Sequence, residues 1–598
     1  MLSWRWMLAV LVLGLTPALG LAQNINNQVC PRPAAGSVIP EPKDLRSQNG
    51  VLKAELTYRS FHDEHGQIRY CYRYRDGSQA PNLRVKPGDW LVLTLKNDLK
   101  PMPIKHPAAA MPMAMAMPSA NRCGSGTMDA WSTNLHFHGL NIAPVCRQDE
   151  VLHTMIAPGD PPFEYRFQIP PDEPPGVYWY HPHVHGFSNA QVLGGASGAL
   201  IVEGIERANP SLAGLPERVL IIRDQELLNP AAVPTQSSVD VPVLRDAEGD
   251  VLNTGTGGGK PAKDLSLNFV PVPYPDYRPG VIPIKPGERQ LWRILNASAV
   301  TYVDLQVLSH GVAQPLGVVS LDGVPVNENG MAGNRVLWES NVLLPPAGRI
   351  DFVFKGLPAG TQETLVTRAV DTGPAGENDP VRPLATIVSR TDAPEPRSKL
   401  SETPAPAVPQ TVAWLGDVKP VRERKLYFSE KPSNPSDPNS PTVFSITVDG
   451  HDPVPYDPRS TVPDITVQQG DVEDWIIENR SRELHAFHIH QLHFLLTEWD
   501  GVPVDEPFLR DTVNVPYWDG GSRVYPSVKL RMDFRNPRIV GTFVYHCHLL
   551  EHEDGGMMGT IRVEARNQTS RITSSRRTVL AKNSRILSPK AITPSSSK

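Results

Sequence analysis

Residues 541–558 read Gly-Thr-Phe-Val-Tyr-His-Cys-His-Leu-Leu-Glu-His-Glu-Asp-Gly-Gly-Met-Met. The opening residues are rich in β-branched and aromatic side chains, and they predict a β-strand that runs into the His-Cys-His triplet. Successive side chains of a strand point to opposite faces, so Cys547 points one way while His546 and His548 point the other. The stretch therefore predicts two metal sites, one on each face, joined through the backbone.

Three further His-x-His pairs share the same spacing: His136-Phe-His138, His181-Pro-His183 and His488-Ile-His490. Both imidazoles of a pair lie on one face of an extended segment, so the four pairs supply eight imidazoles to one polynuclear site. His485 has the opposite parity to the pair that follows it. This parity places His485 in a separate mononuclear site with Cys547, His552 and Met557.

The donor types indicate which metal the sites hold. Two imidazoles, a thiolate and a weak axial thioether form the ligand set of a blue-copper electron-transfer centre. Neutral imidazole suits copper, zinc, iron and nickel alike, but the added Cys and Met favour copper. A structural zinc site would need closed Cys and His tetrads with CxxC-like spacing, and the sequence has none. Ordinary core histidines are the remaining alternative, and such regular spacing argues against them.

Composition favours an exported all-β protein. The 598 residues include 62 prolines, about twice the usual ~5% share, and high proline with short apolar runs is typical of many-turned β domains. The net charge of -5 gives no indication of a nucleic-acid partner. Residues 1–22, with Arg5 before an apolar run and small residues at the end, predict a secretory signal peptide. The alternative, a membrane anchor, would need a longer apolar run. We expect a soluble periplasmic or secreted monomer without a membrane partner.

Cysteine usage agrees with export. Four cysteines remain beside Cys547, and an even number in an oxidising compartment favours disulfides: Cys30, Cys71, Cys123 and Cys146. Three connectivities are possible. We favour Cys30–Cys71 with Cys123–Cys146, because the second would bracket the His136/His138 strand. Free thiols are the alternative.

An internal repeat sets the number of domains. Each copy opens with a turn glycine and ends its strand at an asparagine after the same spacing: Gly88 to Asn97, Gly287 to Asn296 and Gly470 to Asn479. Residues 176–183 also parallel residues 541–548, with Pro182 where Cys547 stands. The middle copy has no His-x-His pair. The polynuclear site must then lie between the first and third copies, with the middle copy as a spacer.

We therefore expect six segments. They are a signal peptide (1–22), domain 1 with half of the polynuclear site (45–205), domain 2 as a spacer without copper ligands (206–390), a Pro-rich linker (391–412), domain 3 with the mononuclear site and the other half (413–565), and a basic tail (566–598). The Ser/Thr-rich tail is expected to be disordered, and a surface-binding role is its alternative.

These motifs, in this order, resemble those of the three-domain multicopper oxidases, which include the laccases and the bacterial copper-efflux oxidases. The resemblance covers roughly residues 45–565. It implies three cupredoxin-like Greek-key β-sandwich domains and four copper ions: one type 1, one type 2 and two type 3. It also implies that electrons from a reductant enter at type 1 and pass through Cys547 to a trinuclear cluster that reduces O2.

The resemblance also assigns each ligand. Type 1 would take His485, Cys547, His552 and axial Met557, and type 2 would take His136 and His488. The type 3 pair would take the six remaining imidazoles: His138, His181, His183, His490, His546 and His548. Asp149 and Glu553 match acidic positions that look like proton-relay residues, so both are candidate catalytic residues beside Cys547. Their alternative is a carboxylate at the surface or behind a ligand. Asp511 is a further candidate that would orient a ligand imidazole.

Residues 546–558 are especially close to the copper-efflux oxidases, yet the chain departs from them. It has no twin arginine in the signal region and no Met-rich insert in domain 3, and Ala486 and Gln491 replace the usual Pro and Gly of the third motif. A Met-rich segment does occur in domain 1, with methionines at 102, 111, 113, 115 and 117. Thioethers favour Cu(I). Cu(I) capture and a biased insertion loop are the two interpretations.

The leading functional hypothesis is a laccase-like oxidase that couples one-electron oxidation of phenols, aromatic amines or metal ions to reduction of O2 to water. A cuprous oxidase for copper tolerance is the alternative within enzymes. A copper-free scaffold is disfavoured because every ligand is retained, and a copper store needs no Cys between two sites.

Overall fold

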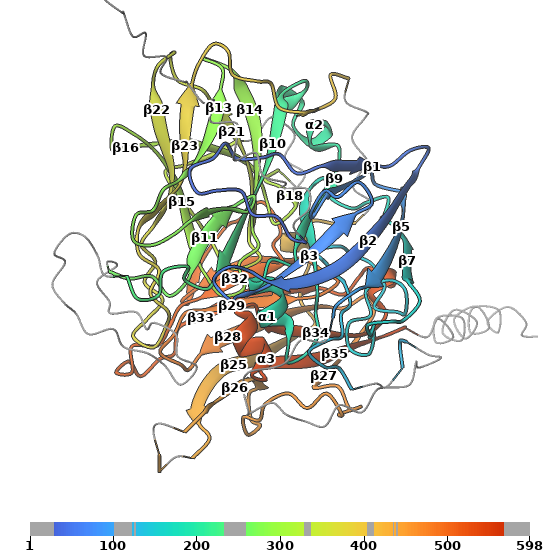
Figure 1. The fold of residues 1–598 in the computed structure, drawn as a ribbon. Helices are drawn as coiled ribbons and strands as arrows, with labels where there is room; N and C mark the ends of the chain where they lie inside the picture. Colours follow the sequence, from blue (N-terminus) through green and yellow to red (C-terminus); the bar gives the residue numbers. More distant parts are fainter. Residues whose placement is uncertain are drawn as a thin grey trace, which may run out of the picture.

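The computed structural model describes residues 29–100, 122–124, 127–232, 259–327, 336–403, 412–434, 436–437 and 440–566. In these residues nearly all regular structure is β, arranged as three pairs of sheets (Figure 1), which confirms the all-β prediction. The predicted signal peptide, the Met-rich segment 102–117 and the tail beyond residue 566 lie outside the described residues.

Domain 1 combines a four-stranded and a five-stranded sheet. The first has the order β3 (Ile68–Tyr74), β2 (Val51–His62), β5 (Trp90–Asn97), β7 (Phe163–Gln168). The second has the order β1 (Asp44–Arg46), β4 (Asn82–Val85), β9 (Gly198–Val202), β8 (Gly176–His181), β6 (His136–His138). Alternate residues of β5, namely Leu91, Leu93 and Leu95, face the core, as a half-buried strand requires. Helices α1 (Ser188–Leu193) and α2 (Ile205–Ala208) and the 3-10 turn η3 (Pro210–Leu212) complete it.

Domain 2 has the larger sheets. The nine-stranded one runs β12 (Val270–Val272), β11 (Asp264–Leu267), β10 (Pro216–Gln225), β14 (Arg289–Asn296), β21 (Arg349–Lys355), β17 (Leu316–Leu321), β18 (Val324–Pro325), with β19 (Leu337–Glu339) on β17 and β24 (Ser398–Lys399) on β10. The six-stranded one runs β13 (Gly280–Ile284), β23 (Arg382–Ser389), β22 (Gln362–Arg368), β15 (Val303–Ser309), β16 (Val312–Gln314), with β20 (Val342–Leu344) on β15. The predicted linker thus includes β24, and its residues 404–411 lie outside the described residues.

Domain 3 carries the remaining two sheets. The six-stranded one runs β26 (Thr442–Val448), β25 (Arg422–Pro432), β28 (Val472–Asn479), β33 (Ser527–Asp533), β30 (Phe494–Trp499), β31 (Val502–Pro503). The five-stranded one runs β27 (Ile465–Gln468), β35 (Met558–Glu564), β34 (Gly541–Cys547), β29 (His485–Ile489), β32 (Thr512–Val515). The short helices are α3 (Leu550–Asp554), η4 (Leu415–Asp417) and η5 (Pro537–Ile539).

The three repeated segments occupy equivalent places in their sheets. They form β5, β14 and β28, each paired in parallel with one long strand (β2, β10, β25) and antiparallel with another (β7, β21, β33). Each closing asparagine is buried, and its side-chain amide donates to two or three backbone carbonyls of neighbouring loops. Because a buried carbonyl without a partner is costly, this amide explains why the same residue ends all three strands.

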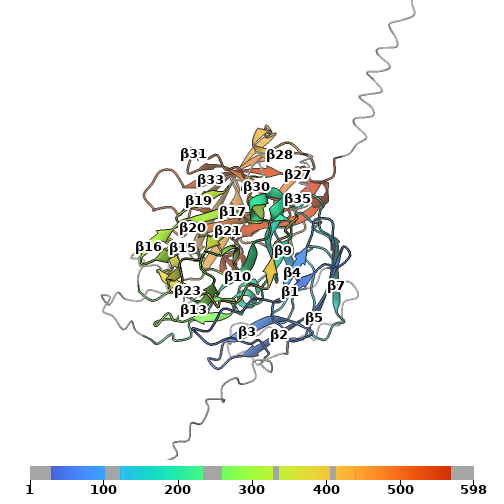
Figure 2. The ribbon, with the colours of Figure 1, turned by 90° about the horizontal axis from the view of Figure 1, so that it is seen from above.

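The domains pack through buried contacts. An apolar cluster joins β8 and β9 of domain 1 to β10 and β14 of domain 2. Domain 3 lies below both in the orientation of Figure 1, and the view from above separates its strands from those of domain 1 (Figure 2). Helix α1 of domain 1 contacts α3 of domain 3, where the Asp554 carboxylate accepts from the Ser188 and Asn189 amides at 3.1 and 2.8 Å. The seam between domains 1 and 3 therefore includes specific polar contacts, beside an apolar cluster of Val151, Val544 and Met558.

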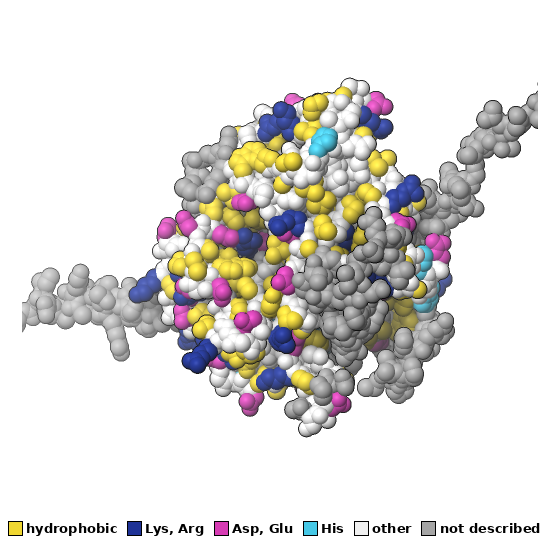
Figure 3. Space-filling view, turned by 90° about the vertical axis from the view of Figure 1, so that its left-hand side faces the viewer, with side chains coloured by type: hydrophobic (Ala, Val, Ile, Leu, Met, Phe, Trp, Pro, Cys, Tyr) yellow, Lys and Arg dark blue, Asp and Glu magenta, His cyan; other side chains and the backbone are white. Residues whose placement is uncertain are grey.

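On the face shown in Figure 3, acidic and basic side chains are interspersed with apolar ones. Within the described ranges, no helix combines the length and the apolar character that crossing a bilayer would require.

Candidate metal centres

Four strands position the histidine pairs. In domain 1, β6 lies antiparallel to β8 with His136 opposite His181, and in domain 3, β29 lies antiparallel to β34 with His488 opposite His546. Each pair therefore enters the seam between the two domains from the end of a strand. All eight imidazoles are buried.

The eight imidazoles sort into two triads and a pair. Potential ligand atoms lie within 4.8 Å of one another in the sets His138, His181, His548 and His183, His490, His546. His136 and His488 remain, and they group with His138 in the same way. Each triad draws imidazoles from both domain 1 and domain 3. Two triads and a pair match the ligand counts that the resemblance implies for the type 3 pair and type 2.

Unpartnered nitrogens show that the residues fit bound metal. His136 Nε2, His138 Nδ1, His181 Nε2, His183 Nε2, His488 Nε2, His490 Nδ1 and both nitrogens of His548 are buried without a hydrogen-bond partner among the described residues. Buried polar atoms are normally satisfied, so such a concentration points to ligands. Burial, with the neighbouring imidazoles, lowers the pKa of His136 and His490 well below the usual range, which keeps these rings neutral as metal ligands require.

The opposite nitrogens are held by backbone or carboxylate oxygens. Nδ1 of His181, His546 and His488 donates to the carbonyls of Pro182, Cys547 and Asp511 at 3.0, 2.9 and 2.8 Å. A carbonyl can only accept, so each bond leaves Nε2 of the same ring without a proton and available to a metal. His138 is reversed, since its Nε2 lies 3.2 Å from the Asp511 carboxylate and its Nδ1 is the unpartnered atom.

The mononuclear site lies on the other face of β34. Cys547 Sγ is 3.4 Å from His485 Nδ1 and 3.9 Å from His552 Nδ1, and the two nitrogens are 3.3 Å apart. Met557 is buried, and its carbonyl accepts from the Cys547 amide at 3.1 Å. Burial raises the pKa of the Cys547 thiol, so metal binding there has to displace a proton.

Two carboxylates lie at the outer edges of the two imidazoles of the mononuclear site. His485 Nε2 is 2.8 Å from Ser481 Oγ and 3.0 Å from Glu430 Oε1, and His552 Nε2 is 3.6 Å from Glu483 Oε1. The side chains of both glutamates retain some exposure, 15% for Glu430 and 9% for Glu483. The sequence interpretation did not include them. Glu483 was detectable because it has the same parity as His485, whereas Glu430 carries no signal in the chain.

The two candidate relay acids lie against the cluster imidazoles. Asp149 accepts from His136 Nδ1 at 3.0 Å and from the Phe137 amide at 2.8 Å. Glu553 Oε2 is 3.2 Å from His546 Nδ1, and its Oε1 is 3.6 Å from His183 Nε2. Both carboxyls are fully buried, so neither is a surface group, and burial raises the pKa of Asp149 to about 8. The proposed relay role stays a prediction.

Gln491, the departure from the third motif, acquires a role in the structure. It adopts φ +61°, in the left-handed region that favours glycine, and it is buried. Its amide nitrogen donates to the Asp149 carboxylate, while its carbonyl oxygen has no partner in the described part of the chain. A domain 3 side chain thus holds a domain 1 carboxylate.

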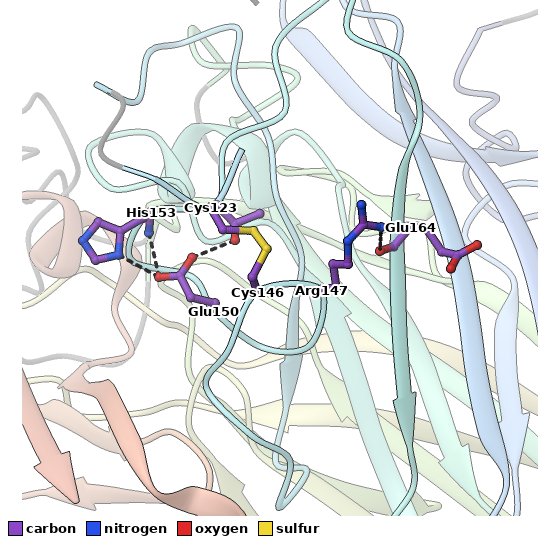
Figure 4. The surroundings of a disulfide bond; sticks show 7 residues. Cys123, Cys146, Arg147, Glu150, His153 and Glu164 are labelled. Atoms are coloured by element: carbon purple, nitrogen blue, oxygen red, sulfur yellow. Dashed lines mark hydrogen bonds and ion pairs between the residues drawn. A yellow bond between two sulfur atoms is a disulfide. The ribbon is translucent and has the colours of Figure 1, made fainter. Parts of the chain in front are cut away.

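Both expected disulfides form. Cys30 is bonded to Cys71, and Cys123 to Cys146, which leaves Cys547 as the free cysteine and confirms the favoured pairing. Figure 4 shows the second bond beside Glu150, whose carboxylate accepts from the His153 amide at 2.9 Å. The disulfide between Cys123 and Cys146 fixes the loop that leads to Asp149.

Comparisons with known proteins agree with this geometry. Two family models described as multicopper oxidase match residues 128–207 and 434–567, the segments that contain all the candidate ligands. A multicopper oxidase of Staphylococcus aureus is 23% identical over 518 residues, which is 86% of this chain and 88% of that protein. The laccase of Bacillus subtilis is 21% identical over 406 residues, or 66% of this chain and 71% of the laccase.

A solved structure supports the fold. The multicopper oxidase of Campylobacter jejuni, described as a metallo-oxidase, aligns with a TM-score of 0.59 at 22% identity, covering 89% of this chain and 96% of its own. This likeness, with the three sheet pairs, confirms three cupredoxin-like β-sandwich domains. Domains 1 and 3 each match a multicopper oxidase family model, over the segments that supply the two triads, the pair and the Cys547 site. The chain therefore belongs to the multicopper oxidase family.

Proposed function

We propose that this protein couples one-electron oxidation of an external reductant at a type 1 copper to four-electron reduction of O2 to water at a trinuclear copper cluster. The coarser statement follows from the family: the protein is a copper-dependent oxidoreductase that uses O2 as electron acceptor. As reductants we propose metal ions, phenols or aromatic amines, with metal ions favoured by the geometry below.

One observation carries the proposal. Cys547 lies in the mononuclear donor set, while its neighbours His546 and His548 belong to the two triads. Three consecutive residues therefore connect one site to both halves of the other. A storage site would have no use for this connection, but electron transfer between two centres depends on it.

Bound copper would supply single-electron acceptance at type 1 and delivery of four electrons to O2, which with four protons yields two waters. His485, Cys547, His552 and Met557 would hold the type 1 ion. The pair His136 and His488 would hold type 2, and the two triads would hold type 3. The chain's own contribution is to fix the tautomers, since each carbonyl bonded to an imidazole decides which ring nitrogen is free.

Two buried carboxyls are positioned to carry the protons. The Asp149 carboxyl contacts His136, which belongs to the pair, and the Glu553 carboxyl contacts His546, which belongs to a triad. We propose that each holds a proton at a carboxyl oxygen and passes it inward. Complete burial supports this role, because it raises the pKa of both carboxyls, so each keeps a proton that it can release.

The acidic edge of the type 1 site favours a cationic reductant. Glu430 and Glu483 approach the outer nitrogens of both type 1 imidazoles, where an electron would enter. Carboxylates that retain some exposure attract a metal cation and lower its cost of approach. A neutral phenol gains less from this arrangement.

Oxygen uptake by the copper-loaded protein, with Cu(I), Fe(II) and a methoxyphenol as parallel reductants, tests the proposal. Glu430→Gln and Glu483→Gln should raise KM for the metal ions more than for the phenol. Glu395→Gln is the matched control, since that carboxylate is exposed in the segment 391–412, and its one ion pair among the described residues is with Lys285 at 2.6 Å. Equal effects on all three reductants would refute the cation preference, and no uptake with any of them would refute the oxidase.

A cuprous oxidase for copper tolerance is the second candidate. The same acidic edge suits Cu(I), and the Met-rich segment 102–117, outside the described residues, would add soft ligands. Deleting 102–117 should then slow Cu(I) oxidation more than phenol oxidation. We further propose a periplasmic or secreted location, which the two disulfides support.

A further inference from the structure

A domain 2 arginine reaches the polynuclear site. Arg349 is the first residue of β21 and is fully buried. Both of its terminal nitrogens donate hydrogen bonds to the Asp511 carboxylate, Nη1 to Oδ1 at 2.6 Å and Nη2 to Oδ2 at 2.5 Å. The two parallel bonds form the forked geometry in which Arg and carboxylate pair most strongly. Asp511, also fully buried, is the carboxylate that contacts His138 Nε2.

The guanidinium joins all three domains at one point. Nε donates to the Val177 carbonyl on β8 of domain 1 at 3.1 Å, and Nη2 also donates to the Asp322 carbonyl of domain 2 at 2.8 Å. Asp511 belongs to domain 3. Val177 lies on the same strand as His181, so the contact anchors the strand that carries a triad ligand.

Asp511 transmits this anchoring to two ligands from different domains. Its carboxylate lies 3.2 Å from His138 Nε2, and its backbone carbonyl accepts from His488 Nδ1 at 2.8 Å. One residue therefore decides that His138 presents Nδ1 and that His488 presents Nε2. His138 belongs to a triad and His488 to the pair, so both copper types depend on where Asp511 stands.

The backbone is shaped to admit this contact. Gly139, directly after the first His-x-His motif, has φ +90°, and a Cβ built there would lie 2.7 Å from Arg349 Nη2 and 2.7 Å from Asp511 Oδ2. Only glycine leaves room for the ion pair at this position. The glycine of the first motif is thereby explained by a domain 2 side chain.

We propose that Arg349 is a positioning residue for the polynuclear copper site, acting through Asp511 to fix which nitrogen of His138 and of His488 is free to bind metal, and to hold domains 1 and 3 in register. Domain 2 is then the clamp of the site as well as a spacer. This inference rests on the proposed function, because it concerns how the copper ligands are held.

Arginine suits the position and lysine does not. The guanidinium makes its bonds to Asp511, Val177 and Asp322 from one rigid plane, whereas an ammonium is a point charge on a flexible stem. Arg349→Lys keeps the buried charge that balances Asp511, but it removes the fork and the bonds that Nε and Nη2 donate to the Val177 and Asp322 carbonyls. It therefore tests positioning with less risk of unfolding than a neutral substitution.

The test compares the wild-type protein, Arg349→Lys and Arg84→Lys. Arg84 is the matched control because it is equally buried and bridges domains 1 and 2 through Glu217 at 2.5 Å and Asp44 at 2.8 Å, away from the imidazole groups. Four quantities are measured: copper per chain, type 1 blue absorption, the type 2 EPR signal under a competing chelator, and Tm of the copper-free protein. Imidazole nitrogen NMR of the copper-free protein adds the His138 tautomer.

Arg349→Lys should weaken retention of type 2 copper by about 10- to 100-fold, as loss of support behind a ligand typically does, with type 1 absorption unchanged. Its His138 resonance should show a mixture of tautomers. Arg84→Lys should lower Tm alone. Unchanged type 2 retention in Arg349→Lys, or parallel loss of type 1 and type 2 copper, would overturn the inference. A wild-type protein that binds no copper would overturn the proposed function and the inference together.

Discussion

Substitution of Gln491 separates backbone strain from hydrogen bonding. With φ at +61°, a residue with a Cβ is strained by about 1 kcal/mol, and glycine is not. Gln491→Ala keeps the strain and loses the bond to Asp149. Gln491→Gly loses the same bond but relieves the strain. The glycine variant should therefore be the more stable of the two by about 1 kcal/mol, the reverse of the usual order in regular structure.

The wild type should lie near the glycine variant. The bond to a carboxyl contributes about 1–3 kcal/mol, while the strain and the unpartnered Gln491 carbonyl together cost a similar amount. Thermal melting of the copper-free protein measures the difference, and for a domain of this size 1 kcal/mol shifts Tm by about 2–4 °C. An alanine variant at least as stable as the glycine variant would refute the strain argument. The type 2 EPR signal should change in both variants, since Asp149 loses one donor.

Three further predictions follow from the same geometry. Cys547→Ser should abolish the blue absorption and oxygen uptake while most copper stays bound by the imidazoles. Mass spectrometry of the metal content checks the copper that remains, and residual turnover would contradict the proposed electron transfer through Cys547. Gly139→Ala should destabilise the protein by more than about 2 kcal/mol, because its Cβ would overlap the Arg349–Asp511 pair, and a melting curve like the wild type's would show that the pair gives way easily. Copper removal should lower Tm, since copper at 100 times its Kd stabilises by about 2.7 kcal/mol per site; calorimetry with and without a chelator measures this, and coincident curves would count against ligand-held metal.

Strand parity explains why much of the site was accessible from the chain. The alternation of faces separated Cys547 from its two neighbours, and the repeated Gly-to-Asn segment identified three equivalent strands. Parity also places Glu483 on the same face as His485, two residues later, so its position near the mononuclear site could have been predicted. These features are local, and the period of a strand is the same in every fold.

Contacts between domains had no such signal. The sorting of eight imidazoles into triads depends on how β6 and β8 meet β29 and β34 across the seam, which no spacing encodes. Arg349 lies in a domain without a ligand motif, and Glu430 lies on a strand that is distant in sequence from any histidine pair. Gln491 was recognised as a departure, but its bond to Asp149 needed the docked domains.

The division of ligands among domains sets an order of assembly. The type 1 donors all lie between residues 485 and 557, so that site is complete once domain 3 has folded. The triads exist only after the first and last domains have docked, because each takes imidazoles from both. A metal ion held by a triad closes a chain loop that spans the middle domain. Closing this loop costs conformational entropy, and the metal ion avoids that cost only when folding has already brought the two ends together. Maturation should therefore proceed from the C-terminal centre inward, with dioxygen chemistry possible last.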